Sequence, residues 1–286
     1  MPILMDYSQV MLATLFANIG NHTNVEMNDD LLRHMFLVSL RHNRRKFHKD
    51  YGELVICCDG KNSWRREAFP YYKANRRTSR EKSELDWNDL FRIMGNIRDE
   101  LAEYFPYKVI QIDRCEADDI IGVVCHANGT QLNTGSERFL ILSGDKDYIQ
   151  LQKYANVDQY DPVKKKFIRH QNPDEYLIEH VFKGDTGDGV PNILSADNCL
   201  VIGERQKPMT AKRMSVFKES LDNMDETTKI RYHRNKMMID LEQTPETYKK
   251  QILEAYNQEK DIGRSKLFNY FIEKKLKGLM TDIGDF

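Results

Sequence analysis

The chain has 286 residues, and its 43 Lys and Arg nearly balance its 44 Asp and Glu, which leaves a formal net charge of −1. Hydrophobic residues make up 40% and charged residues 30%, a composition that supports a packed core and excludes a disordered chain. No apolar run approaches the ~18 residues of a membrane span, and we expect no secretory leader. The five Cys form no zinc spacing and no even disulfide set, so a reducing cytoplasm is the expected location.

Short apolar runs alternate with amphipathic stretches along the first part of the chain. We predict strands at residues 3–5, 54–58, 108–112 and 138–142, and helices at 8–17, 29–49, 86–104 and 117–126. Asn28 and Gly52 suit the start and the end of the second helix. This alternation predicts an α/β fold with a mostly parallel central sheet flanked by helices.

The second part of the chain carries a different pattern. Residues 161–174 are expected to form a hairpin or loop, and from about residue 175 the sequence indicates helices alone. We therefore divide the chain into an α/β domain, residues 1–180, and a smaller all-helical domain, residues 181–286.

Charge is segregated along the chain although the total is nearly neutral. Residues 41–82 carry thirteen basic and five acidic side chains, whereas residues 113–188 carry nine basic and fourteen acidic ones. A mixed-sign surface is the ordinary explanation of many charges. Here, however, the basic run alternates with aromatic residues around Trp64 and at Tyr71 and Tyr72, a texture that suits a polyanion whose bases stack on rings.

Acidic residues follow several of the predicted strands. Asp6, Asp59, Asp145 and Asp147 come directly after strands, Glu116, Asp118 and Asp119 open a helix, and Asp185 and Asp188 lie in a glycine-rich loop. Each one alone is most simply a turn former or a helix cap. Together they meet at the carboxyl edge of the sheet, where ligands bind in open α/β folds. Such a cluster needs cations to offset its repulsion, and Mg²⁺ is the hard cation that carboxylates bind beside phosphates.

Taken in order, these motifs resemble those of the 5′-nuclease (flap endonuclease) superfamily. The resemblance rests on Asp6, Asp59, the stretch 116–119, the stretch 143–147 and the stretch 184–188. The segment from Ser63 to Arg76 resembles the basic helical arch of the same family, which would cover about residues 61–104. The match extends over nearly the whole chain.

The resemblance implies a role for each of these residues. One metal site would be formed by Asp6, Asp59, Glu116, Asp118 and Asp145, and a second by Asp147, Asp185 and Asp188, with Asp119 nearby. Two Mg²⁺ ions would be bound, with Mn²⁺ as a substitute. Lys73 would lie beside the scissile phosphate and complete the catalytic set with Asp6, Asp59, Asp118 and Asp145. Nucleic acid would be held by Arg65, Arg66, Tyr72, Lys73, Arg76, Arg77, Arg205, Lys207, Lys212 and Arg213.

The implied reaction is metal-dependent hydrolysis of RNA–DNA and DNA duplexes from the 5′ end, with cleavage of 5′ flaps and forks. Its role would be the removal of RNA primers in lagging-strand replication, in the host cytoplasm if the source is a phage. We expect a monomer without a membrane partner, recruited by a single-stranded DNA-binding protein. The helical domain would resemble a helix–turn–helix, but its Gly189 to Pro208 stretch lacks the family's second paired glycine.

Other classes of protein stay open at this point. A non-catalytic nucleic-acid-binding factor would have lost some carboxylates, yet all the expected ones are present. A PIN-type ribonuclease shares the acidic core but is usually shorter and lacks the arch. A haloacid-dehalogenase phosphatase needs Asp-x-Asp after the first strand, which Asp6-Tyr7-Ser8 does not provide.

Overall fold

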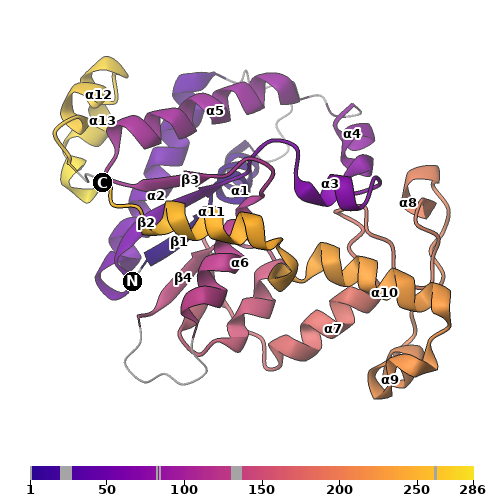
Figure 1. Ribbon diagram of the computed structural model, residues 1–286. Coiled ribbons are helices and arrows are strands. Elements are labelled where there is room, and N and C mark those ends of the chain that lie inside the picture. Colours follow the sequence, from indigo (N-terminus) through magenta and orange to yellow (C-terminus); the bar gives the residue numbers. More distant parts are fainter. Residues whose placement is uncertain (1, 20–27, 82, 84, 130–136, 261–262) are drawn as a thin grey trace.

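The computed structural model describes residues 2–19, 28–81, 83, 85–129, 137–260 and 263–286, apart from the side chains of residues 19 and 77–79. Its centre is a six-stranded sheet in the order β3-β2-β1-β4-β5-β6 (Figure 1). The strands are β1 (Pro2–Asp6), β2 (Glu53–Cys58), β3 (Lys108–Gln111), β4 (Phe139–Leu142), β5 (Val157–Asp161) and β6 (Lys166–Ile168). All neighbours pair in parallel except β5 with β6, which confirms the predicted α/β fold with a mostly parallel sheet.

Strand β1 lies in the middle of the sheet because both of its faces are apolar. Ile3 and Met5 belong to the core on one face, whereas Leu4 belongs to the core on the other. All three side chains are completely buried, as expected for a parallel strand that helices cover on both sides.

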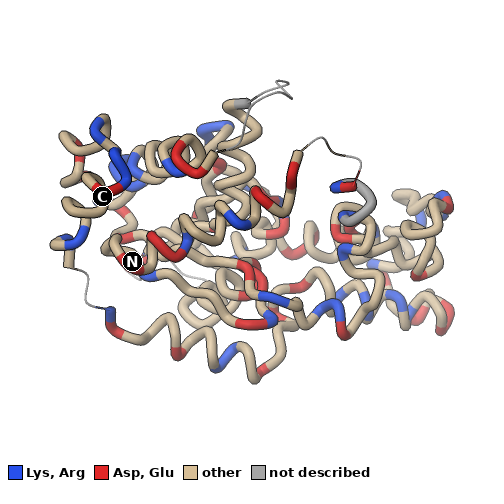
Figure 2. Tube along the Cα trace, turned by 90° about the horizontal axis from the view of Figure 1, so that it is seen from above, with Lys and Arg blue, Asp and Glu red and all other residues tan. Residues whose placement is uncertain are grey.

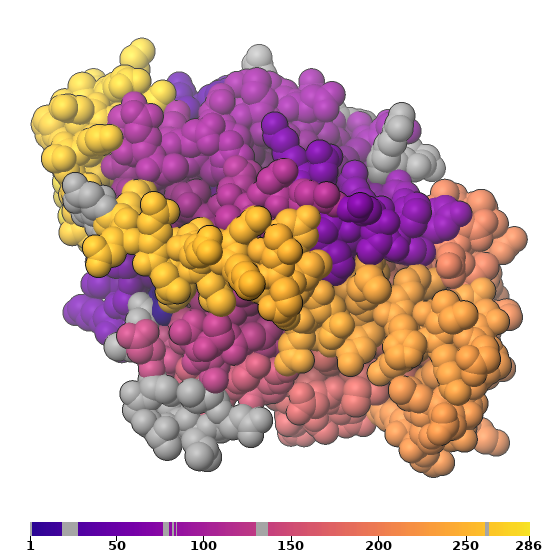
Figure 3. All heavy atoms as spheres, in the orientation of Figure 1, coloured from indigo at the N-terminus to yellow at the C-terminus, as the bar shows by residue number. Residues whose placement is uncertain are grey.

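The first face of the sheet is covered by α1 (Tyr7–Ile19), α2 (Asp29–Tyr51) and α5 (Trp87–Tyr104). The Asn28 side chain caps α2 by accepting from Leu31 N, and Gly52 ends the helix at φ 77°, as predicted. The opposite face is covered by α6 (Ala117–Asn128), the 3₁₀ helix η1 (Asp147–Lys153) and α11 (Glu246–Asn257). Figure 3 shows α11 lying across the surface of the α/β part.

The last helices of the chain return to the sheet. Helices α12 (Leu267–Glu273) and α13 (Lys277–Met280) pack in the same core as α1, α2 and α5. Phe271 and Phe286 meet the Phe105 ring with centroids 6.2 and 5.7 Å away. Arg44 donates to the Asp285 carbonyl at 2.9 Å. Residues beyond about 240 are therefore structurally part of the α/β unit.

The remaining helices lie at the other end of the molecule. They are α3 (Trp64–Ala68) and α4 (Ala74–Glu81) in the basic segment, then α7 (Pro173–Lys183), α8 (Cys199–Ile202), α9 (Ala211–Glu219) and α10 (Glu226–Ile239). Short 3₁₀ turns η2 (Leu221–Asn223) and η3 (Leu241–Gln243) connect later helices, and η4 (Ile283–Asp285) follows α13. Seen from above, basic positions are interspersed with acidic ones over the helical region (Figure 2).

The fold bears on two expectations from the sequence, the absence of a membrane span and the absence of a disulfide framework. Within the described ranges no helix is long and apolar enough to cross a membrane. All five cysteines are free and buried, so they contribute to the core rather than to a disulfide framework.

The packing of α12 gives a direct test of its place in the core. Phe271 is completely buried, whereas Phe268 on the same helix is 55% exposed. We expect Phe271→Ala to lower the free energy of unfolding by about 3–5 kcal/mol, because it removes a buried ring and leaves a cavity. Phe268→Ala is the matched control and should change it by less than about 1 kcal/mol. Equal losses in urea unfolding would contradict the packing described here.

Candidate active site

The acidic side chains collect at the carboxyl edge of the sheet because their strands are neighbours. Asp6 is the last residue of β1, and Asp59 follows β2, which pairs with β1 in parallel. Asp145 follows β4, the parallel neighbour on the other side of β1. Strand order therefore brings these carboxylates to the same edge, and the Asp59 carboxylate accepts from the N–H of Ala117 at the start of α6 at 2.9 Å.

Asp6 and Asp118 share one phenol. The Tyr148 Oη atom lies 2.9 Å from Asp6 Oδ2 and 2.7 Å from Asp118 Oδ1. The Tyr148 hydroxyl can donate only one proton. Without a cation, one of the two carboxyls therefore has to be protonated to form the second hydrogen bond. Burial and the charge of Asp59 raise the pKa of Asp6 to about 7. Burial and the charge of Asp6 also raise the pKa of Asp118.

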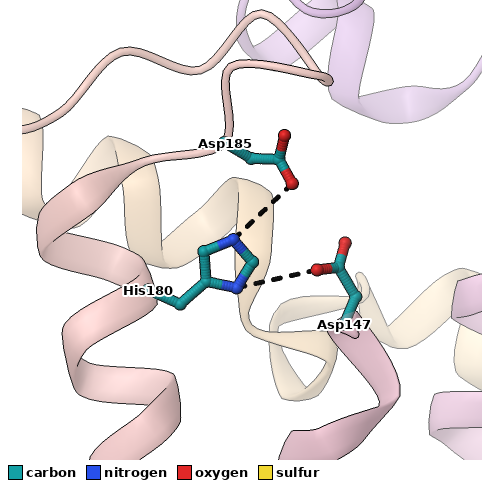
Figure 4. Close-up of side chains that lie close together, drawn as sticks. All are labelled: Asp147, His180 and Asp185. Atoms are coloured by element: carbon teal, nitrogen blue, oxygen red, sulfur yellow. Dashed lines mark ion pairs between the residues drawn. The ribbon is translucent and has the colours of Figure 1, made fainter. Parts of the chain in front are cut away.

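A second group forms around His180, whose ring lies between two carboxylates (Figure 4). His180 Nδ1 is 3.6 Å from Asp147 Oδ1, and Nε2 is 3.5 Å from Asp185 Oδ2. One ligand atom from each of the three residues lies within 4.8 Å of the others. Burial, together with the charge of Asp145, raises the pKa of Asp147 to about 8. Burial alone would lower the pKa of His180, but Asp185 and Asp147 raise it above its ordinary value.

The basic segment reaches into this edge through Lys73. The Lys73 Nζ atom lies 2.6 Å from Glu116 Oε1 and 3.5 Å from Asp188 Oδ2, so it connects residues of the two predicted metal sites. Its backbone, at φ 56°, donates to the Asp188 carbonyl at 2.7 Å. Burial would raise the pKa of Glu116, but Lys73 and Arg65 hold it at about 2.

Two further contacts fix the base of the arch on the acidic loop. Asn75 donates to the Thr186 carbonyl at 2.7 Å, and Arg76 donates to the Gly187 carbonyl at 3.2 Å. The Arg76 guanidinium also pairs with the Asp188 carboxylate. The arch and the loop that carries Asp185 and Asp188 are therefore held together as one polar unit.

Asp119, predicted to lie near the metals, is next to Glu116 but is bonded to protein donors. It is completely buried, and its Oδ2 accepts from Arg65 at 2.9 Å and from the Glu116 N–H at 2.8 Å. Its Oδ1 accepts from Trp64 Nε1 at 3.2 Å and from Thr244 Oγ1 at 2.8 Å. Since protein donors occupy both oxygens, this carboxylate holds the structure together and is not available as a metal ligand.

Two residues predicted to bind nucleic acid are also buried. Arg65 is 1% exposed and donates to Asp119 and to the Met238 carbonyl. Tyr72 is 3% exposed, and its Oη lies 2.7 Å from Glu116 Oε2 and 2.9 Å from Asp188 Oδ2. The basic and aromatic pattern suggested exposed contacts, but these side chains face the acids instead, so neither can stack on a base or hold a phosphate.

The other predicted nucleic-acid contacts remain accessible where they are described. Arg66 is exposed at the foot of the arch, and Arg76 is partly exposed. Four further predicted contacts follow α8 and are exposed: Arg205 and Lys207 in the segment before α9, and Lys212 and Arg213 on α9. The Arg77 side chain lies outside the described part of the chain.

The sequence analysis missed His180 and Tyr148. His180 lies on α7 and precedes Asp185 by five residues, and Tyr148 directly follows Asp147. Their nearness to acidic motifs was the available signal. It was weak because nothing in the sequence shows which face of α7 or η1 turns to the sheet edge.

The donor set suits a hard divalent cation. It consists mainly of carboxylate oxygens, the ligands that Mg²⁺ and Mn²⁺ prefer. Burial, and after it the charges of neighbouring carboxylates, raises the pKa values of Asp6, Asp118 and Asp147. A bound cation would favour the ionised form of each. The residues present therefore fit a divalent metal centre.

Comparison with known proteins identifies the class of protein. Residues 3–180 match the family model "5'-3' exonuclease, N-terminal resolvase-like domain", and residues 172–286 match "T4 RNase H, C terminal". The chain belongs to the 5′-3′ exonuclease family of the flap endonuclease superfamily and is a nuclease.

Individual relatives narrow this placement. The chain is 32% identical over 299 residues to ribonuclease H of Enterobacteria phage T4, covering 99% of this chain and 95% of the relative. A bacteriophage T5 5′-exonuclease structure with bound zinc has the same fold, with TM-score 0.60, 15% identity and coverage of 99% and 98%. A T5 flap endonuclease structure described as a complex with DNA and metal ions matches with TM-score 0.57, 16% identity and coverage of 99% and 97%.

The close approach of arch and loop depends on Gly189. Its φ is 72°, and an added Cβ would lie 2.7 Å from the Tyr71 carbonyl oxygen. Gly203 also has a positive φ, 74°, but an added Cβ would meet nothing within 4 Å. We expect Gly203→Ala to cost about 1–2 kcal/mol of backbone strain. Gly189→Ala should cost more and also reduce cleavage, because it displaces the arch base from Asp188. Urea unfolding and a cleavage assay measure both effects, and equal behaviour of the two variants would contradict a specific contact.

Proposed function

We propose that this chain is a Mg²⁺-dependent 5′-3′ nuclease that hydrolyses RNA–DNA and DNA duplexes from the 5′ end and cuts 5′ flaps. The observation that carries this proposal is the position of Lys73. It brings a cation from the basic arch to Glu116 and Asp188, residues of both predicted metal sites. A polyanionic substrate that crosses the arch would thus meet the acidic edge at this point.

The acidic residues would form two metal sites. Asp6, Asp59, Glu116, Asp118 and Asp145 would hold one Mg²⁺, and Asp147, Asp185 and Asp188 the other. When bound, such a pair supplies charge stabilisation to the attacking and leaving oxygens of a phosphodiester. Tyr148 orients Asp6 and Asp118 through its hydroxyl.

Lys73 is held ready by the same acids. Metal cations bound at Glu116 and Asp188 would replace the contacts that Lys73 makes with these carboxylates. The released ammonium would then face the scissile phosphate and offset charge that develops in the transition state.

A non-catalytic binding factor is the alternative from another class. The buried, mutually repelling acids of the cluster weigh against it, because they destabilise a protein that has no cation to bind there. A PIN-type ribonuclease lacks the arch. In this chain the predicted arch range, about 61–104, contains α3 and α4, and its last part, α5, packs on the sheet.

The similarity to phage T4 ribonuclease H along the whole chain supports a proposal for the biological role. We propose removal of RNA primers during lagging-strand synthesis, by a monomer recruited through a single-stranded DNA-binding protein in the host cytoplasm. Exposed Arg66, Arg205, Lys207, Lys212 and Arg213 would contact the phosphates of the duplex.

The test uses a 5′-labelled RNA–DNA hybrid and a flapped DNA duplex. With Mg²⁺ we expect short products from the 5′ end, and with EDTA none. Asp145→Asn should reduce cleavage to background because a ligand charge is lost, while duplex binding persists or improves because repulsion of phosphate falls. Wild-type cleavage by the variant would refute the role of Asp145, and cleavage in EDTA would refute the metal-dependent mechanism.

A second test separates a catalytic from a binding role for Lys73. If Lys73 acts in the transition state, Lys73→Ala should slow single-turnover cleavage about 10²-fold with little change in affinity. If it only binds phosphate, affinity should fall modestly and the salt slope by about one, with normal cleavage at saturation.

Arg80 provides the control for that measurement. Its guanidinium lies over the rings of Trp87 and Phe91, 5.3 and 4.8 Å from their centroids, rather than beside the acids. We expect Arg80→Ala to show only the binding effect. A Lys73→Ala enzyme that cuts bound substrate at the normal rate would exclude the catalytic role and leave the nuclease assignment intact.

A further inference from the structure

His180 brings an imidazole to the acidic edge of the sheet. It lies on α7 in the last turn before Gly184, and the loop that follows carries Asp185 and Asp188. The Tyr176 ring, one turn earlier, packs against the imidazole with centroids 5.8 Å apart. The ring is thereby directed between Asp147 and Asp185, as Figure 4 shows.

We propose that His180 is a direct ligand of the divalent cation held by Asp147 and Asp185. This inference rests on the proposed metal-dependent function and adds a nitrogen ligand to the second site. It distinguishes this chain's site from one made of carboxylates and water alone.

The closeness of the three side chains is what supports a shared cation. One ligand atom from each of Asp147, His180 and Asp185 lies within 4.8 Å of the others, and ligand atoms around an octahedral cation with bonds of about 2.1 Å lie about 3–4 Å apart. In this structure Nδ1 faces Asp147 at 3.6 Å and Nε2 faces Asp185 at 3.5 Å. Since one imidazole nitrogen binds a given cation, the ring would turn and both carboxylates would shift toward that nitrogen to complete the site.

The ligand set has a consequence for metal choice. Both Mg²⁺ and Mn²⁺ bind carboxylate oxygens, but Mn²⁺, as a transition metal, accepts an imidazole nitrogen more readily than Mg²⁺, which retains water. The second site should therefore bind Mn²⁺ more tightly relative to Mg²⁺ than carboxylates alone would. The contrasting role for His180 is that of an imidazolium that neutralises Asp147 and Asp185 and competes with the cation.

The experiment measures Mn²⁺ bound to the full-length protein without nucleic acid. Electron spin-echo spectroscopy detects ¹⁴N of an imidazole bound to Mn²⁺, and calorimetry gives the affinities for Mn²⁺ and Mg²⁺. The variant is His180→Gln. The control is His42→Gln, since His42 is exposed on α2, which covers the sheet face opposite α6 and η1.

We expect imidazole ¹⁴N modulation in the wild type and in His42→Gln, and its loss in His180→Gln. The variant should also lose about 10-fold or more in Mn²⁺ affinity at one site, with a smaller change for Mg²⁺. Mn²⁺ binding without imidazole modulation in the wild type would overturn the inference and leave the nuclease proposal standing. Tighter Mn²⁺ binding by His180→Gln would also overturn it, in favour of a competing imidazolium. Failure of the wild type to bind Mn²⁺ at all would contradict the metal-dependent function itself.

Discussion

Repulsion among carboxylates at one sheet edge is the constraint on which the rest of this structure depends. Parallel pairing of β1 with β2 and β4 brings Asp6, Asp59 and Asp145 to that edge, whatever the energetic cost of placing them together. Burial raises the pKa values of Asp6 and Asp147, and the charges of Asp59 and Asp145 raise them further. Basic side chains from outside the sheet offset this cost. Their contacts connect the arch and the helical region to the acidic edge.

The offsetting cations are of two kinds. Arg65 is fully buried and bonded to Asp119 and a backbone carbonyl, so its charge is permanently committed to the fold. Lys73 and Arg76 pair with carboxylates that metal ions would also bind, so their contacts are exchangeable. A polyanion and its metals could replace them without loss of net neutrality. One basic segment thus contains both a structural anchor, Arg65, and a cation that pairs with the acidic edge, Lys73.

The sequence predicts the acidic edge of the sheet but not the side chains that contact it. Buried strands that end in Asp are visible from local apolar runs, and their parallel order follows from the intervening helices. Strand β5 was missed because Asp158 and Gln159 interrupt its apolar pattern. Arg65 and Tyr72 were read as exposed because a basic, aromatic run looks the same whether it faces solvent or buried acids. Only tertiary contacts decide this, and the same holds for the return of α12 to the core.

The buried network also fixes the helical region relative to the catalytic edge. Arg65 donates to the Met238 carbonyl near the end of α10, and Thr244 beyond it donates to Asp119 on α6. The Gln150 side chain of η1 bonds both the Ile239 carbonyl and the Leu241 N–H, at 3.0 and 2.9 Å. These links join the basic segment, α6 and η1 to the same short stretch of chain. Because unpaired polar groups are costly at such depth, the helical region cannot turn freely about this stretch. A duplex held by its exposed basic residues would therefore meet the acids in a defined orientation.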